Sequence, residues 1–141
     1  MIHFNYQTPL RIRHIRQLKA FLQELIISEK HTAGPLNFVF CTDAYLLKIN
    51  QQYLNHHDYT DIITFSFSEE KQVVSGELYI SVDRVKENAK RFNVPLSNEL
   101  HRVMFHGVLH LCGYNDKTKA QAAQMRQRED HYLKLYSKRS T

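Results

Sequence analysis

Hydrophobic and polar residues follow two different periods in the first third of the chain. Residues 2–6 alternate between apolar and polar side chains, which is the period of a half-buried strand. From residue 12 to residue 26, apolar side chains recur at steps of three and four, which predicts an amphipathic helix ending near Lys30. The apolar, β-rich run 36–41 then predicts a second strand. The chain therefore opens with a strand, a helix and a strand.

The middle of the chain continues this alternation. Thr42 and Asp43 supply side-chain oxygens suited to capping a helix. The apolar residues expected on the buried side of that helix are Ala44, Leu47 and Leu54. Segments 60–67 and 76–82 are rich in β-branched and aromatic residues, so they predict two further strands on either side of the polar link 68–75.

The last third of the chain is predicted to be helical. Asp83 is expected to cap a short helix, and Ser97 a longer one that ends at Gly113. The apolar residues assigned to the short helix are Val85, Ala89 and Phe92. A last helix is predicted over residues 118–136. Four strands and about five helices predict one small α/β (α+β) domain over residues 1–141, with a mixed sheet covered by helices.

Composition and charge restrict the class of protein further. Of the 141 residues, 43% are hydrophobic and only four are glycine and three proline, which excludes a disordered or fibrous chain. No run approaches the roughly 20 apolar residues of a membrane span, and the N-terminus does not resemble a signal peptide. We therefore expect a soluble, cytoplasmic protein with no membrane partner. Its net charge of +5 suits a polyanionic partner without requiring one.

The two cysteines are expected to be reduced and buried. Cys41 and Cys112 each lie inside an apolar run, where free thiols usually pack as small hydrophobic groups. A disulfide is therefore not expected.

Residues 106–116, HGVLHLCGYND, carry the most informative chemistry in the chain. His106 and His110 lie one helical turn apart, so both imidazoles can reach one ion. Gly113 can end the helix in a left-handed conformation and bring Asp116 back toward them. Two imidazoles and a carboxylate form a ligand set for zinc with a fourth position open to water, as in catalytic sites. The alternative is a core helix whose histidines are satisfied by polar neighbours.

Two further features of the sequence bear on the interpretation of residues 106–116 as a metal site. A zinc peptidase with the same spacing places a glutamate directly after the first histidine as general base, and here that residue is Gly107. The glycine instead suggests close approach of another segment. The adjacent His56, His57 and Asp58 are expected to form an exposed polar loop, since neighbouring histidines rarely converge on one ion.

The motif and three upstream blocks together resemble the YbeY family of bacterial endoribonucleases. Residues 106–116 are similar to the family's HGxLHLxGYDH signature, and the other blocks follow in the family's order. These are INQQY (49–53), TDIITF (60–65) and GELYIS (76–81), with Met125 and Glu129 matching a final Met-x-x-x-Glu helix.

The resemblance implies a zinc-dependent endoribonuclease specific for single-stranded RNA. Its implied task is ribosomal RNA maturation at the 3′ end of the small-subunit RNA, with a role in ribosome quality control and the small subunit as a partner. One Zn²⁺ per chain is expected on the C-terminal half's signature helix, bound by His106, His110 and Asp116, which would act through the metal-bound water. Asp116 stands where the family has a histidine, and it should make the metal a weaker Lewis acid.

A second departure concerns substrate binding, because Leu54 stands where the family has an arginine thought to contact the RNA phosphate. Lys48 or Arg102 are candidate replacements, and Thr64 could orient a phosphate. Glu77 is a candidate partner for a metal-bound histidine. Two alternatives follow: an RNA- or ribosome-associated protein with structural zinc and no turnover, or a metal hydrolase of another substrate such as a peptide.

Overall fold

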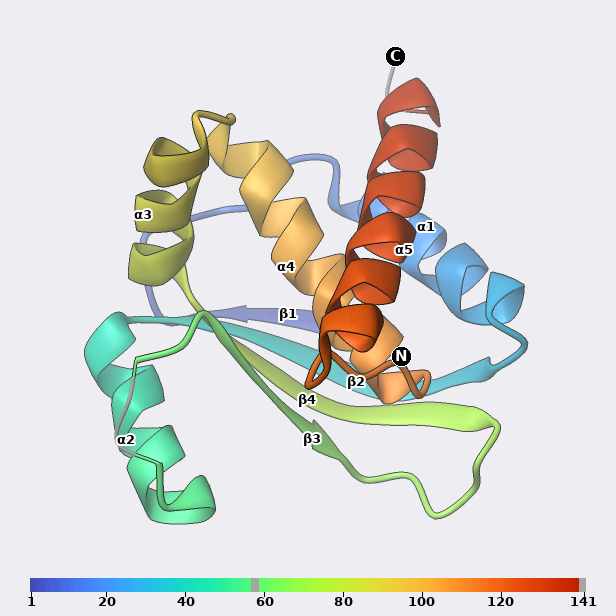
Figure 1. Ribbon diagram of the computed structural model, residues 1–141, viewed down its shortest axis with the longest axis horizontal. Coiled ribbons are helices and arrows are strands. Elements are labelled where there is room, and N and C mark those ends of the chain that lie inside the picture. The colour runs from blue at the N-terminus through green and yellow to red at the C-terminus, as the bar shows by residue number, and fades with distance from the viewer. Residues whose placement is uncertain (57–58, 140–141) are drawn as a thin grey trace.

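Four strands form one mixed sheet with the order β1-β2-β4-β3 (Figure 1). The structure is a computed structural model, and it describes residues 1–56 and 59–139. The elements in these ranges are β1 (Ile2–Tyr6), α1 (Ile15–Ser28), β2 (Thr32–Cys41), α2 (Asp43–Leu54), β3 (Ile62–Ser66), β4 (Val73–Ser81), α3 (Val82–Phe92), α4 (Leu96–Leu111) and α5 (Lys119–Arg139). His57 and Asp58 of the predicted polar loop lie outside the described residues.

The sheet is parallel except at one edge. β1 pairs with β2 and β2 with β4 in parallel, with Phe4, Phe38 and Leu78 in register, and β3 pairs with β4 in antiparallel orientation. Four strands and five helices in the described ranges confirm the predicted mixed α/β fold.

Helices cover the two faces of the sheet unequally. In Figure 1, α1, α3, α4 and α5 lie over one face, whereas α2 lies on the other. Because side chains alternate along a strand, β2 and β4 bury one row of apolar residues against the larger group of helices. The fully buried members of this row are Leu36, Phe38, Phe40, Leu78 and Ile80.

Helix α4 approaches the sheet closely at Gly107. A Cβ atom built on this residue would lie 2.6 Å from both Ile62 Cδ1 and Leu78 Cδ2. The buried residues on either side of it, Phe105 and Val108, belong to the main core. The glycine thus permits the close approach that its position in the motif suggested, and this contact fixes the signature helix against β3 and β4.

The predicted buried side of α2 is wrong. The helix buries Leu46, Ile49 and Asn50, whereas Leu54 is 41% exposed. Apolar side chains occur on several sides of this helix, so their spacing alone did not select the side that meets β4. Thr42 does cap the helix, because its hydroxyl accepts a hydrogen bond from the Tyr45 amide at 3.1 Å.

The predicted caps of the next two helices are also wrong. Helix α3 is capped by Ser81, whose hydroxyl accepts from the Arg84 amide. Asp83 instead accepts from the backbone N–H of Asp43, at the start of α2. Helix α4 begins at Leu96 after Pro95, so Ser97 lies inside its first turn and caps nothing.

Both cysteines are free, as expected. Cys41 is buried and Cys112 is partly buried, and burial raises the pKa of each thiol to about 12. Across the described ranges, no helix combines the length and apolar character that a membrane span needs.

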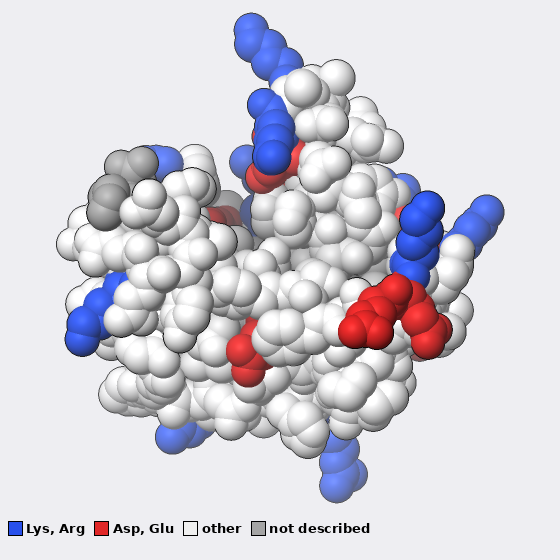
Figure 2. Space-filling model, turned by 90° about the horizontal axis from the view of Figure 1, so that it is seen from below, with Lys and Arg blue, Asp and Glu red and all other residues white. Residues whose placement is uncertain are grey.

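The face on which α2 lies carries no continuous basic patch. In Figure 2, which views the molecule from below, lysine and arginine side chains stand apart around the rim, and the mostly uncharged middle carries acidic side chains. The positive charge of the chain is therefore not concentrated on this face.

Candidate functional site

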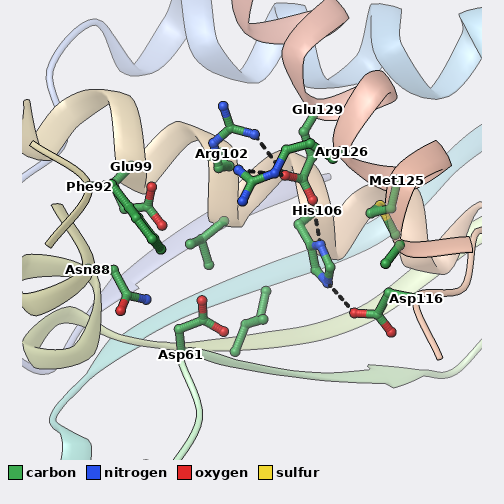
Figure 3. Close-up of a pocket in the computed structure, with 13 residues that line it drawn as sticks. Asp61, Asn88, Phe92, Glu99, Arg102, His106, Asp116, Met125, Arg126 and Glu129 are labelled. Carbon is green, nitrogen blue, oxygen red and sulfur yellow. Dashed lines mark hydrogen bonds and ion pairs between the residues drawn. The ribbon is translucent and has the colours of Figure 1, made fainter. Parts of the chain in front are cut away.

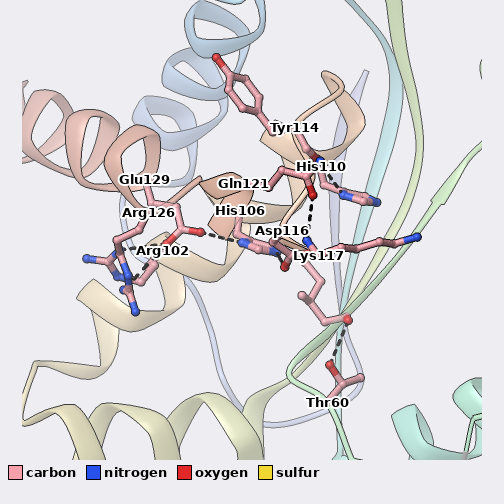
Figure 4. Close-up of polar contacts among 11 residues, drawn as sticks. Thr60, Arg102, His106, His110, Tyr114, Asp116, Lys117, Gln121, Arg126 and Glu129 are labelled. Carbon is pink, nitrogen blue, oxygen red and sulfur yellow. Dashed lines mark hydrogen bonds and ion pairs between the residues drawn. The ribbon is translucent and has the colours of Figure 1, made fainter. Parts of the chain in front are cut away.

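His106 lies between two carboxylates, as Figure 4 shows. Its Nδ1 is 2.6 Å from Glu129 Oε2, and its Nε2 is 3.4 Å from Asp116 Oδ2. Burial disfavours the charged imidazole, but the hydrogen bond and charge of Glu129 outweigh this effect, helped by Asp116, and raise the pKa of His106. When Nδ1–H donates to Glu129, Nε2 is free to bind a cation on the side of Asp116.

Glu129 connects this histidine to an arginine. The carboxylate is only 5% exposed on α5, and it also accepts a hydrogen bond from Arg102 Nη1 at 2.9 Å. Arg102 lies one turn before His106 on α4, and its Nη2 binds Asp130 at 2.6 Å. The guanidinium of Arg102 compensates the buried charge of this carboxylate.

The turn after α4 brings Asp116 to this position. Gly113 has a φ of +108°, which confirms the expected left-handed end of the helix. The Tyr114 hydroxyl donates to Glu29 Oε1 at 2.7 Å, and Arg128 of α5 binds the other oxygen of the same carboxylate at 2.8 Å. Glu29 therefore ties the turn and α5 to the end of α1.

His110 is separate from the pair formed by His106 and Asp116. It is exposed, and its Nδ1 lies 3.1 Å from the carbonyl oxygen of Tyr114, which leaves Nε2 free. In the part of the chain that the structure describes, no three His, Cys, Asp or Glu side chains are gathered closely enough to hold a metal. The donor types nevertheless fit zinc, because two imidazoles and a carboxylate are available and Glu129 backs one imidazole as ligating histidines require.

A cavity of about 400 Å³ opens beside His106 (Figure 3). Charged or titratable side chains from α4, α5, the turn between them and the segment before β3 line it. These residues are Asp61, Glu99, Arg102, His106, Asp116, Arg126 and Glu129. Burial raises the pKa of Asp61 and of Glu99, and nearby positive groups offset this only in part. The cavity therefore contains arginine cations, and it also contains two carboxylates whose ionisation is disfavoured by burial.

Comparison with known proteins shows which family this arrangement belongs to. The family model described as "Endoribonuclease YbeY" matches residues 5–137. The chain belongs to the YbeY family. It is 48% identical over 136 residues to Endoribonuclease YbeY of Flavobacterium psychrophilum, covering 96% of each chain, and 44% identical to that of Flavobacterium johnsoniae, covering 96% and 97%. A solution structure of a protein from Thermotoga maritima has a TM-score of 0.67 and 28% identity, covering 96% of this chain and 89% of that one.

The structure places the remaining candidate residues of this YbeY chain on different faces of the sheet. Thr64 points from β3 toward α4, since its Cγ2 would be 3.4 Å from a Cβ on Gly107. Glu77 points to the other face of the sheet, where it accepts a hydrogen bond from the Tyr79 hydroxyl at 2.9 Å. Lys48 lines a second cavity with Glu77, so neither residue belongs to the cavity beside His106.

The carboxylate that binds His106 is Glu129, whereas the sequence suggested Glu77 as a partner for a metal-bound histidine. One signal was available, because Glu129 shares a helical stripe with Met125 and Tyr132, and an acidic residue on an apolar stripe is usually paired with a specific partner.

Proposed function

We propose that this YbeY-family chain is an endoribonuclease that cleaves single-stranded RNA during ribosomal RNA maturation, at the 3′ end of the small-subunit RNA. The match to endoribonucleases over residues 5–137 supports cleavage of RNA. The structural observation that carries the proposal is the imidazole of His106, which is bound by Glu129 and faces Asp116 at a cavity.

One Zn²⁺ per chain is the proposed cofactor, bound by His106, His110 and Asp116. When bound, zinc supplies a Lewis acid for the charge that develops on the phosphoryl oxygens and lowers the pKa of water. Glu129 would hold the proton of His106 on Nδ1 and fix the ring, so that Nε2 is aimed at the site and can bind the metal through its lone pair. Rotation of the exposed His110 ring and of the half-exposed Asp116 side chain would complete the ligand set.

Arg126 is the cation we assign to the RNA phosphate in place of the missing family arginine. Its side chain is 54% exposed, it lines the cavity, and its Nη1 is 4.0 Å from Glu129. Arg102 lines the same cavity but is only 18% exposed and is held by two carboxylates. Arg102 would therefore position Glu129, while Arg126 has the freedom to meet the substrate.

The family resemblance extends the proposal to the setting of the reaction. Ribosomal RNA would be the substrate, the ribosomal small subunit a partner, and the cytoplasm the location, with a contribution to ribosome quality control. A peptidase is not proposed, because Gly107 stands where zinc peptidases with this spacing carry the glutamate that acts as general base.

One observation favours a second candidate function. Leu54 stands where the family has an arginine, so this position supplies no cation for the RNA phosphate. A protein that binds RNA with zinc as a structural element, and does not turn over, would share this feature.

Cleavage of a labelled single-stranded RNA by zinc-loaded protein tests the proposal. Wild type should cut the single strand and spare its duplex, whereas His110→Ala should lose at least about 100-fold in rate because a metal ligand is removed. His131→Ala, which changes an exposed histidine on α5, should cut like wild type. Binding of RNA without cleavage by folded, zinc-loaded wild type would favour the second candidate. Equal cleavage by wild type and His110→Ala would overturn the proposed ligand set.

A further inference from the structure

Glu99 is a buried carboxylate that makes no hydrogen bond to the described residues, although Arg102 and Arg126 lie near enough to act on its charge. It lies in the first turn of α4, it is only 4% exposed, and it lines the cavity beside His106. None of the described hydrogen bonds or ion pairs involves its side chain, and burial raises its pKa. A buried carboxylate normally accepts several hydrogen bonds, so an unpaired one that faces a cavity calls for donors from a ligand.

Two further side chains lie at the same end of the cavity. Figure 3 shows Asn88 and Phe92 of α3 beside Glu99, on the opposite side of the cavity from Asp116. Phe92 is 48% exposed, and its ring is accessible to a ligand beside the Arg91 guanidinium, which lies 5.2 Å from the ring centroid. The Asn88 amide can both donate and accept hydrogen bonds. Together these three residues provide a ring, a carboxylate and an amide.

We propose that Glu99, Asn88 and Phe92 form a subsite for a guanine base of single-stranded RNA. This inference rests on the proposed function, because it takes RNA as the ligand of the cavity. Guanine presents two adjacent N–H donors, N1–H and the N2 amino group, beside the O6 acceptor. The Glu99 carboxylate would accept both N–H groups, the Asn88 amide would donate to O6, and the Phe92 ring would stack on the base.

The other bases fit this set of groups less well. An ionised carboxylate only accepts hydrogen bonds, and it needs two donors on one edge to use both oxygens. Adenine and cytosine each place one amino group beside a ring acceptor, and uracil places one N–H between two carbonyl groups. The geometry therefore favours guanine over the other three bases.

A structural role of Glu99 makes a different prediction. Carboxylates in the first turn interact favourably with the positive end of a helix, and this would stabilise α4 whatever the ligand. Loss of that interaction would lower the free energy of unfolding and would affect every RNA equally. A preference among bases can arise only if the carboxylate contacts the base.

Binding of short RNAs to the metal-free full chain tests the subsite. The probes are fluorescent octamers of uridine with one central guanosine, inosine or adenosine, measured by fluorescence anisotropy in EDTA, so that zinc-dependent cleavage cannot occur. Wild type should bind the guanosine RNA roughly tenfold more tightly than the adenosine RNA. Inosine, which lacks the N2 amino group, should fall between them.

Three variants distinguish contact with the guanine base from a loss of stability or of affinity for RNA in general. Glu99→Gln presents an amide to the guanine donors and should abolish the preference, and Asn88→Ala should reduce it because O6 loses its donor. Glu87→Gln changes an exposed carboxylate on α3, 63% exposed, and should keep it. Melting temperatures verify folding, and Asn88→Ala tests the subsite even if Glu99→Gln does not fold.

Equal affinity of wild type for the three RNAs, binding of none of them, or an unchanged preference in both Glu99→Gln and Asn88→Ala would overturn the subsite. The result is independent of catalysis. A guanine preference without RNA cleavage in the presence of zinc would refute the proposed function and leave the subsite standing. RNA cleavage in the presence of zinc without a guanine preference would refute the subsite and leave the proposed function standing.

Discussion

At the scale of single residues, the environment of His106 explains how one side chain can be prepared for a metal. Glu129 accepts from Nδ1 and is itself held by Arg102, and the other ring nitrogen of His106 faces Asp116. A carboxylate behind a ligating histidine fixes the ring and increases its basicity. The affinity for zinc should therefore depend on a residue that does not touch the metal.

Glu129→Gln is expected to weaken zinc binding by about 10- to 100-fold, because the amide accepts from Nδ1 without a negative charge. Competition with a chromophoric chelator measures this affinity. Asp130→Asn is the matched control, since Asp130 also binds Arg102 but is 57% exposed and does not contact His106. Equal zinc affinities of Glu129→Gln and wild type would contradict the role of Glu129.

His101 should make the stability of the fold depend on pH. Its ring stacks on Phe105 and meets Tyr136 edge-on, and burial lowers its pKa to about 4. Between pH 6.5 and 4 the unfolded chain therefore binds a proton that the folded chain does not, so stability falls as the pH falls through this window. His101→Phe should remove up to about 3 kcal/mol of this change in the free energy of unfolding.

Urea titrations of wild type and His101→Phe at several pH values measure this difference. The two proteins should differ in slope between pH 6.5 and 4 and run in parallel above pH 7. Parallel curves throughout would mean that the His101 ring is protonated in the folded state.

At the scale of elements, the contact of α4 with β3 and β4 decides where the signature histidines lie. The contact is possible because Gly107 has no Cβ, and the nearest atoms belong to the side chains of Ile62 and Leu78. Neighbouring residues of α4 are buried, so the helix cannot move away without opening the core.

Gly107→Ala is expected to destabilise the fold by about 1–2 kcal/mol, because overpacking outweighs the gain in helix propensity of about 1 kcal/mol. Urea unfolding measures the loss. Ser97→Ala in the same helix should stay within about 0.5 kcal/mol of wild type, since this serine caps nothing. An alanine variant at position 107 as stable as wild type would show that α4 can shift away from the sheet.

The elements themselves could largely be predicted from periodicity. Residues 2–6 and the signature helix were found within a residue or two, because their apolar positions repeat with one clear period. The contact side of α2 and the capping role of Asp83 could not be found, because both depend on which surfaces meet after folding. Asp83 caps a helix 40 residues earlier in the chain, which no local pattern indicates.

At the scale of the whole molecule, the site combines one local motif with distant residues. The predicted ligands come from eleven consecutive residues, 106–116, so their spacing was visible in the sequence. Glu129 and Asp61 reach the same cavity from two other segments, and Glu99 reaches it from the first turn of α4. Their roles depend on burial and on partners, and a sequence shows neither.

The central claim is that one zinc ion, held by His106, His110 and Asp116, makes this molecule an endoribonuclease. The most direct measurement adds zinc in steps to metal-free protein and follows cleavage of a labelled single-stranded RNA. The rate should rise in proportion to zinc up to one equivalent and then stay constant, and His110→Ala should remain inactive over the same range. Full cleavage in EDTA, or no cleavage at any zinc concentration by folded wild type, would contradict the account.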